Sequence, residues 1–170
     1  MHNILITGYP QVGKTSLINN IIRKLEKTSI GMFTNEIRKE GKRIGFKIET
    51  LSGLEYVLAS KNNLTSKYRV ANYGVYLENI DTVIKHLELS IQESNPEVII
   101  IDEIGKMELF SKTFVSFLEK CLDSKRVLGT IMMKDNAYTK QIKGRSDTLV
   151  FHLTRDNQKI IEEKIMESFK

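Results

Sequence analysis

The chain has 170 residues, of which 41% are hydrophobic and 28% charged, a balance that supplies one ordinary core and excludes disorder over most of the length. No apolar run approaches the roughly 18 residues of a membrane-spanning helix, and 10 glycines with 2 prolines exclude a collagen-like or low-complexity chain. A formal net charge of +5 suits anionic ligands without by itself indicating nucleic acid, so we expect a single soluble domain over residues 1–170.

The first third of the chain predicts a strand, a loop and a helix, followed by an antiparallel block. β-type residues 3–7 precede an apolar pattern of helical spacing over residues 17–25. Residues 30–60 then form three β-type stretches, separated by turn sequences at 39–42 and 52–53. We therefore expect β-hairpins in this block.

The remaining two thirds alternate helices and strands. A polar, basic segment at 61–72 is predicted to be a surface loop, and the helical pattern over 80–91 ends at Pro96. The unbroken apolar run Val98–Ile101 is typical of a strand buried on both faces of a parallel sheet. Helix, strand, helix, strand and helix are then predicted near residues 111–122, 127–132, 137–142, 149–153 and 160–169. This alternation predicts an α/β three-layer sandwich with a mostly parallel sheet and an antiparallel hairpin insert.

The loop after the first strand carries a phosphate-binding pattern. Residues 8–15 read GYPQVGKT and fit G-x-x-x-x-G-K-[ST], directly between a predicted strand and a predicted helix. In such a P-loop, backbone N–H groups face phosphate oxygens, the lysine reaches the β- and γ-phosphates, and the threonine hydroxyl binds Mg²⁺. The sequence predicts Lys14 as a catalytic residue and nucleotide contacts from Gly8, Tyr9, Pro10, Gln11, Val12, Gly13, Lys14, Thr15 and Ser16.

Two acidic residues follow the buried strand Val98–Ile101, which carries them to the same sheet edge as the P-loop. Asp102 is expected to hold Mg²⁺ together with Thr15, so Mg²⁺ is the expected cofactor. Glu103 comes one position later, where a carboxylate faces the γ-phosphate and can orient or deprotonate a water molecule. This pair favours hydrolysis of the triphosphate.

The same acidic stretch raises a guanine-specific alternative. Residues 102–105 read DEIG and also fit the D-x-x-G pattern of GTPases. The chain contains no N-K-x-D sequence, so it offers no aspartate motif for reading the guanine donors. A GTPase switch stays a minor alternative.

Basic and hydroxyl side chains elsewhere are candidates for contacts to the phosphates. Arg38 and Arg43 fall in the turn region of the hairpin, where a contact to the triphosphate and a solvated hairpin tip are equally good interpretations. Arg145 is the favoured catalytic arginine, because we expect its glycine-flanked loop to follow a parallel strand at the phosphate edge. Thr130 is interpreted either as a sensor of the γ-phosphate or as a hydrogen-bonded core residue.

Taken together, the motifs resemble those of the THEP1 family of nucleoside-triphosphatases over nearly the whole chain. The resemblance rests on the P-loop, on residues 34–38 and 41–46, on YGV at 73–75 and above all on DEIGKMEL at 102–109. It implies hydrolysis of ATP, GTP and other NTPs to the diphosphate and phosphate, with Mg²⁺, on a RecA-like sheet.

The sequence also departs from the family pattern. Gln11 stands where the family usually has glycine, Ser16 replaces a common threonine, and residues 71–72 replace a small and a basic residue. The first two departures leave the loop N–H groups and Lys14 in place. The family signature includes Lys106 and Glu108, to which the sequence assigns no role.

Two further functions compete with the NTP hydrolase. A nucleotide or small-molecule kinase would use the same P-loop with an acceptor pocket, which Tyr73, Tyr76 and residues 61–69 could frame, although the arginines are too spread out to form a lid. An NTP-gated nucleic-acid binder is supported only by the lysine excess and residues 61–69. With few aromatics and no tryptophan, nucleic acid is not an expected partner.

Two features bear on localisation. The first apolar run begins at Asn3 without a preceding basic segment or cleavage site, and the single cysteine, Cys121, cannot form a disulfide within the chain. We therefore expect a cytoplasmic monomer without a membrane partner.

Overall fold

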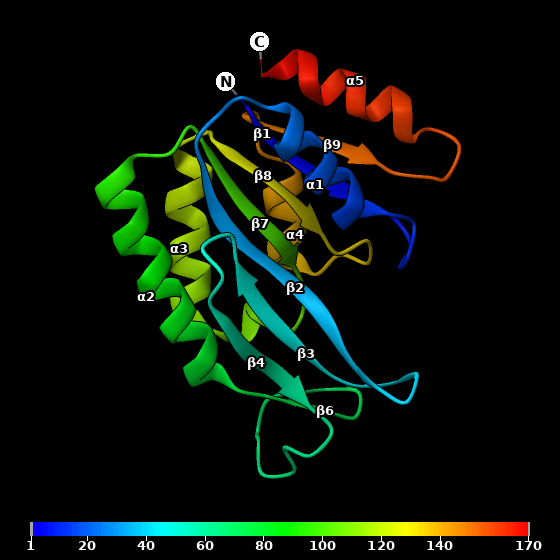
Figure 1. Ribbon diagram of the computed structural model, residues 1–170, viewed down its shortest axis with the longest axis vertical. Coiled ribbons are helices and arrows are strands. Elements are labelled where there is room, and N and C mark those ends of the chain that lie inside the picture. The colour runs from blue at the N-terminus through cyan, green and yellow to red at the C-terminus, as the bar shows by residue number, and fades with distance from the viewer. Residues whose placement is uncertain (1, 170) are drawn as a thin grey trace.

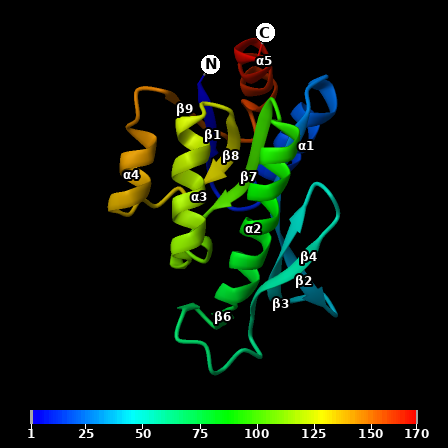
Figure 2. The ribbon, with the colours of Figure 1, turned by 90° about the vertical axis from the view of Figure 1, so that its left-hand side faces the viewer.

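A twisted sheet lies between two layers of helices in the computed structural model, which describes residues 2–169 (Figures 1 and 2). The described residues form one nine-stranded sheet in the order β5-β6-β4-β3-β2-β7-β8-β1-β9. The strands are β1 (Asn3–Thr7), β2 (Ser29–Lys39), β3 (Lys42–Thr50), β4 (Glu55–Ser60), β5 (Arg69–Val70), β6 (Tyr73–Val75), β7 (Val98–Ile104), β8 (Val127–Ile131) and β9 (Thr148–His152). The helices are α1 (Lys14–Lys24), α2 (Leu77–Ser94), α3 (Lys112–Asp123), α4 (Ala137–Lys143) and α5 (Gln158–Ser168), with a 3₁₀ turn η1 (Glu108–Phe110).

The parallel part of the sheet consists of β2, β7, β8, β1 and β9. β1 and β8 are buried along their whole lengths, and in β7 only Glu103 is not fully buried, because neighbouring strands and both helix layers enclose them. Helices α1 and α5 pack on one face around Ile18, and α2, α3 and α4 pack on the other around Phe114 and Phe117. These findings confirm the expected α/β sandwich.

The antiparallel part begins within β2. Its first half pairs in parallel with β7 as far as Phe33 opposite Asp102, and its second half continues beyond that point, paired only with β3. Glu40 and Gly41 close the β2–β3 hairpin with φ angles of 51° and 76°, so both adopt the left-handed conformation of a tight hairpin turn. The hairpin expected at 39–42 is confirmed, and it extends past the carboxyl end of β7.

The segment expected to be a loop at 61–72 contains a strand that the sequence did not predict. β5 pairs with β6, and β6 pairs with β4, so the antiparallel part contains four strands, β3 to β6, in addition to the second half of β2. Both added strands are too short to show an alternating pattern, at 2 and 3 residues. None of the helices in residues 2–169 is long and apolar enough to cross a membrane.

Candidate active site

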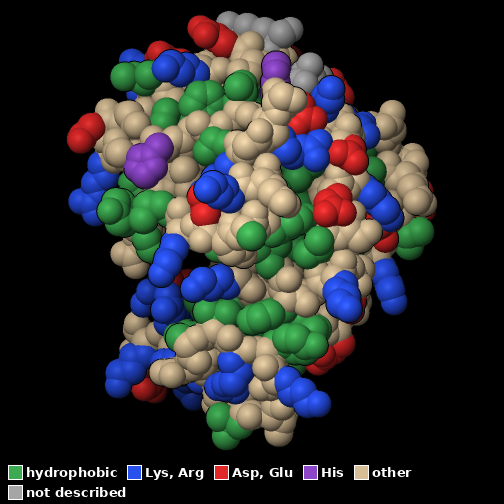
Figure 3. All heavy atoms as spheres, turned by 180° about the vertical axis from the view of Figure 1, so that it is seen from behind, with side chains coloured by type: hydrophobic (Ala, Val, Ile, Leu, Met, Phe, Trp, Pro, Cys, Tyr) green, Lys and Arg blue, Asp and Glu red, His purple; other side chains and the backbone are tan. Residues whose placement is uncertain are grey.

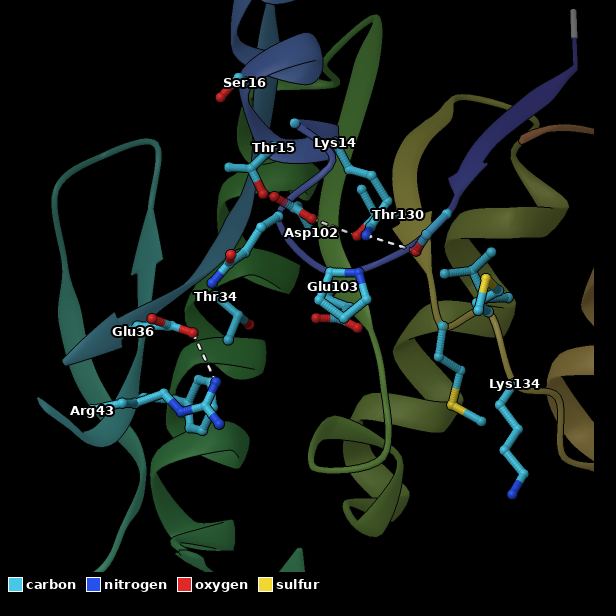
Figure 4. A pocket seen from close by; sticks show the side chains of 18 residues that line it. Lys14, Thr15, Ser16, Thr34, Glu36, Arg43, Asp102, Glu103, Thr130 and Lys134 are labelled. Atoms are coloured by element: carbon cyan, nitrogen blue, oxygen red, sulfur yellow. Dashed lines mark hydrogen bonds and ion pairs between the residues drawn. The ribbon is translucent and has the colours of Figure 1, made fainter. Parts of the chain in front are cut away.

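A cavity of about 660 Å³ opens at the carboxyl ends of the parallel strands, between the loop after β1 and the β2–β3 hairpin (Figure 4). Most of the expected nucleotide and metal residues line it: Gly8, Pro10, Gln11, Gly13, Lys14, Thr15, Ser16, Asp102 and Glu103. The hairpin, the end of β8 and the segment after β8 contribute further lining residues, namely Thr34, Glu36, Arg43, Phe46, Thr130, Ile131, Met132, Met133 and Lys134. The cavity therefore joins groups from four separate parts of the chain.

The loop after β1 has the conformation that its sequence predicts. Gly8 has a φ of 152°, and a Cβ there would lie 2.6 Å from the backbone oxygen of Leu153, so a larger residue would displace the chain after β9. Lys14 begins α1, and its Nζ donates to the carbonyl oxygens of Gly8 and Tyr9, at 3.0 Å each. Gln11 has a φ of 62°, a left-handed conformation that costs a non-glycine residue about 1 kcal/mol. This conformation explains why glycine suits that position.

Asp102 places a carboxylate with one unpaired oxygen at the bottom of the cavity. Its side chain is buried at the end of β7, and Oδ1 accepts a hydrogen bond from the hydroxyl of Thr130. Oδ2 has no hydrogen-bond partner among the described residues. Burial raises the pKa of Asp102, while the hydroxyls of Thr130 and Thr15 and the charge of Lys14 oppose this shift. A buried carboxylate oxygen that lacks a partner, close to a hydroxyl, fits the oxygen ligands that Mg²⁺ prefers.

Two further acids lie beside Asp102. Glu103 follows it on β7, and its pKa is raised by burial and then by the negative charge of Asp102, against the opposing charge of Lys14. Glu108 lies in η1, is 3% exposed, and accepts a hydrogen bond of 2.9 Å from the hydroxyl of Thr34. Burial, followed by the charge of Glu103, raises the pKa of Glu108 to about 8. The sequence did not predict the place of Thr34 and Glu108 in this cluster.

The structure separates the two hairpin arginines. Arg43 lines the cavity, where its Nη1 donates to Glu36 at 2.8 Å and its Nε donates to the hydroxyl of Tyr73 at 3.0 Å. Its guanidinium also lies 5.1 Å from the centre of the Phe46 ring. Arg38 instead binds Glu36 and the carbonyl of Gly41 at the hairpin turn, outside the lining of the cavity.

The expectation that Arg145 lies at the phosphate edge is wrong. Arg145 donates to Asp147 and to Asp123, each at 2.9 Å, and Asp147 accepts the backbone N–H of Asn3 at the start of β1. Its loop follows α4 and leads into β9, so it lies at the amino ends of the parallel strands, opposite the P-loop. The glycine-flanked loop was assigned to the wrong end of the sheet.

Together, the P-loop between β1 and α1 and the acidic end of β7 define a P-loop nucleotide-binding α/β protein. Residues 3–166 match the family model described as NTPase. A curated relative, nucleoside-triphosphatase THEP1 of Thermotoga sp. strain RQ2, is 43% identical over 169 residues, which cover 98% of this chain and 95% of that protein. The chain belongs to the THEP1 family of nucleoside-triphosphatases and is a hydrolase.

Animal relatives and solved structures agree with this assignment. The mouse cancer-related nucleoside-triphosphatase homolog is 38% identical, with 92% of this chain and 90% of that protein covered. The crystal structure of THEP1 from Aquifex aeolicus has a TM-score of 0.84 at 34% identity, covering 100% of this chain and 99% of the other. The solution structure of a human cancer-related nucleoside triphosphatase has a TM-score of 0.77 at 31% identity, covering 100% and 98%. None of these relatives supports the kinase alternative.

Proposed function

We propose that this chain hydrolyses ATP, GTP and other nucleoside 5′-triphosphates to the diphosphate and phosphate in a reaction that requires Mg²⁺. One observation carries the proposal: Lys14, the unpaired oxygen of Asp102 and the carboxylate of Glu103 line the same cavity. These groups supply a cation for the phosphates, a ligand for the metal and an acceptor for a proton of water.

The residues divide the reaction among them. The loop N–H groups and Lys14 bind the β- and γ-phosphates, and Thr15 and Asp102 would hold Mg²⁺. Bound Mg²⁺ would neutralise charge on the phosphate oxygens. Glu103 orients a water molecule toward the γ-phosphorus and accepts its proton, while the bond from the γ-phosphorus to the β–γ bridging oxygen breaks. Glu103 is half-buried, and this partial desolvation strengthens its electrostatic interaction with the reacting groups.

Base selectivity is expected to be weak. The polar groups that distinguish this cavity are those of the P-loop and the acidic cluster, which address phosphates and metal. ATP, GTP, CTP and UTP should therefore be hydrolysed within about tenfold of one another in kcat/KM, a spread of roughly 1.4 kcal/mol. Steady-state kinetics with the four nucleotides measure this spread, and a larger preference for one base would reveal a base-reading contact.

The decisive experiment compares nucleotide binding with phosphate release in Glu103→Gln. Glutamine keeps the shape and a hydrogen-bonding group but removes the basic carboxylate. We expect Mg²⁺-ATP to bind nearly as before, while hydrolysis falls by about 10²- to 10⁴-fold. Glu93→Gln, an exposed position on α2, makes the same chemical change away from the cavity and serves as the control. Hydrolysis within a few-fold of wild type in Glu103→Gln would remove Glu103 from the mechanism.

Product analysis tests hydrolysis against transfer to an acceptor. The purified protein is incubated with Mg²⁺-ATP alone, and free phosphate is measured against the ADP formed. Equal amounts of phosphate and ADP are expected, because water is the only acceptor present. Failure to release phosphate without an added acceptor would contradict the proposal.

A further inference from the structure

Glu108 is a buried acid in the candidate active site that the hydrolysis mechanism does not use. It lies at the start of η1, separated from the end of β7 by three residues, and it is 3% exposed. The hydroxyl of Thr34 donates to its Oε1 at 2.9 Å, across 74 positions of sequence. Thr34 belongs to the part of β2 that continues beyond its pairing with β7, so this hydrogen bond joins the hairpin to the acidic turn.

Gly105 lies beside the carboxyl groups of both Glu108 and Glu103. A Cβ on Gly105 would lie 3.0 Å from Oε2 of Glu108 and 3.2 Å from Oε1 of Glu103. The two carboxyl groups therefore converge on the space that a side chain at this position would occupy. Gly105 has no left-handed φ, so the lack of a side chain, and not backbone conformation, is what this position supplies.

The Thr34 contact determines which oxygen of Glu108 can carry a proton. Because the Thr34 hydroxyl donates to Oε1, a proton on Glu108 belongs on Oε2, the oxygen that borders the same space beside Gly105 as Oε1 of Glu103. Two carboxyl groups that face one shared space do not both ionise readily, and Glu108 is the more deeply buried of the two. Burial, followed by the negative charges of Glu103 and Asp102 on β7, raises the pKa of Glu108 to about 8, against the opposing hydrogen bonds from its own backbone and from Thr34. Glu108 is thus the member of the pair that retains a proton near neutral pH.

We propose that Glu108 is a positioning residue whose protonated carboxyl donates a hydrogen bond from Oε2 to Glu103 and holds the Glu103 carboxylate toward the attacking water. This inference rests on the proposed role of Glu103 in hydrolysis. Thr34 fixes the orientation of Glu108, and Gly105 leaves the space that the hydrogen bond needs. Glu108 itself is not among the residues that line the cavity, so it acts through Glu103 and not on the nucleotide.

Two substitutions of similar volume distinguish a positioning role of Glu108 from a role in packing alone. Glu108→Met fills the buried space without a hydrogen bond, whereas Glu108→Gln offers an amide donor toward Glu103 and a carbonyl that accepts from Thr34. We expect Glu108→Met to lower kcat by about 10- to 100-fold with the affinity for Mg²⁺-ATP nearly unchanged, because Glu103 loses its orientation. Glu108→Gln should recover most of that loss. Equal losses in the two variants, or a loss in Gln alone, would overturn the proposal.

A double-mutant cycle tests whether Glu108 acts through Glu103. Once Glu103→Gln has removed the basic carboxylate, adding Glu108→Met should cost little more, so the combined loss falls far short of the product of the two single losses. Additive losses would show an independent effect and overturn the proposal. If Glu103→Gln alone retains hydrolysis, the proposed role of Glu103 fails first. If only the Glu108 variants are without effect, the role of Glu103 stands and the positioning fails.

Stability measurements keep the test interpretable. Thermal unfolding of each variant shows whether the fold persists. If Glu108→Met does not fold, Thr34→Val provides the same test, because it removes the hydroxyl that fixes Oε1 while retaining the shape of the side chain. A decrease in kcat that exceeds any change in nucleotide affinity supports the proposal, and an unchanged kcat contradicts it.

Discussion

The polar groups at the two ends of the parallel strands differ in how completely they are hydrogen-bonded within the protein. At the amino ends, Asn3 donates to the carbonyl of Leu122 and accepts the N–H of Val127, while Arg145 is bound by Asp123 and Asp147. At the carboxyl ends, Oδ2 of Asp102 is buried without a hydrogen-bond partner among the described residues, and two further acidic side chains, Glu103 and Glu108, lie near it. Polar groups at the amino ends bind one another, whereas those at the carboxyl ends have capacity left for a ligand. Position in the sheet, more than residue type, indicates which polar groups act in chemistry.

The strongest test of this contrast is Lys14→Ala. The substitution removes the one cation of the P-loop while leaving the loop glycines and the fold in place, so triphosphate turnover should fall by about 10³-fold. Nucleotide affinity should weaken as well, because the proposed contact of Lys14 with the phosphates forms before the reaction and persists during it. Phosphate release and nucleotide titration measure the two effects, and turnover at the wild-type rate would end the P-loop argument.

Asp102→Asn tests the unpaired carboxylate oxygen. The amide keeps the size of the side chain but lacks the negative charge for the metal, so we expect a loss of about 10²-fold at ordinary Mg²⁺ concentration. Added Mg²⁺ should partly restore the rate, which a titration of kcat/KM against Mg²⁺ would show. Activity that does not depend on Mg²⁺ in either protein would contradict the metal-binding role.

Gly105→Ala tests whether hydrolysis depends on the space between the acidic side chains at the carboxyl ends of the strands. The new Cβ would crowd Oε2 of Glu108 and Oε1 of Glu103, so we expect hydrolysis to fall by about tenfold with little change in nucleotide affinity. Gly144→Ala is the matched control at the other end of the strands, where the nearest atom would lie 3.4 Å from the new Cβ. Hydrolysis that responds equally to the two changes would show a general effect of added side chains.

The smallest effect is expected for Arg145→Ala. Its hydrogen bonds lie at the amino ends of the strands, so kcat should stay within about twofold of wild type, and the melting temperature should fall by at most about 2–4 °C. Steady-state kinetics and thermal unfolding provide the two measurements. A large loss of hydrolysis with an unchanged melting temperature would contradict the structural role that its position indicates.

Much of the fold and of the phosphate site could be predicted because the relevant signals are local. The apolar run before Asp102 predicts a buried parallel strand, and the pattern from Gly8 to Thr15 fixes a loop between a strand and a helix. Parallel strands present their carboxyl ends at one edge, which brings Lys14 and Asp102 together without any knowledge of distant contacts.

The remaining features depend on contacts between residues far apart in the chain, which no local sequence pattern predicts. The partner of Glu108 is Thr34, 74 positions away, so a buried acid in η1 looks like a surface residue in the sequence. The sequence predicts the alternation of elements around Arg145 correctly, but its loop leads into the parallel strand β9 instead of following a strand, so Arg145 lies at the opposite edge from the one expected. For Arg43, the hairpin itself was a usable signal, since β2 continues past Asp102 and carries its partner strand to the cavity.

The strand order also has a consequence for how the protein is made. β1 lies between β8 and β9, and the residue after β9, Leu153, donates its backbone N–H to Thr7 at 2.7 Å. Gln158 of α5 donates to the carbonyl of Val12 inside the P-loop at 2.8 Å. Residues 3–16 thus complete their contacts only when the last quarter of the chain is present, which requires slow, long-range closure during folding. During synthesis, the complete P-loop sequence is therefore present long before β8, β9 and α5, the elements that contact β1 and the P-loop in the folded protein.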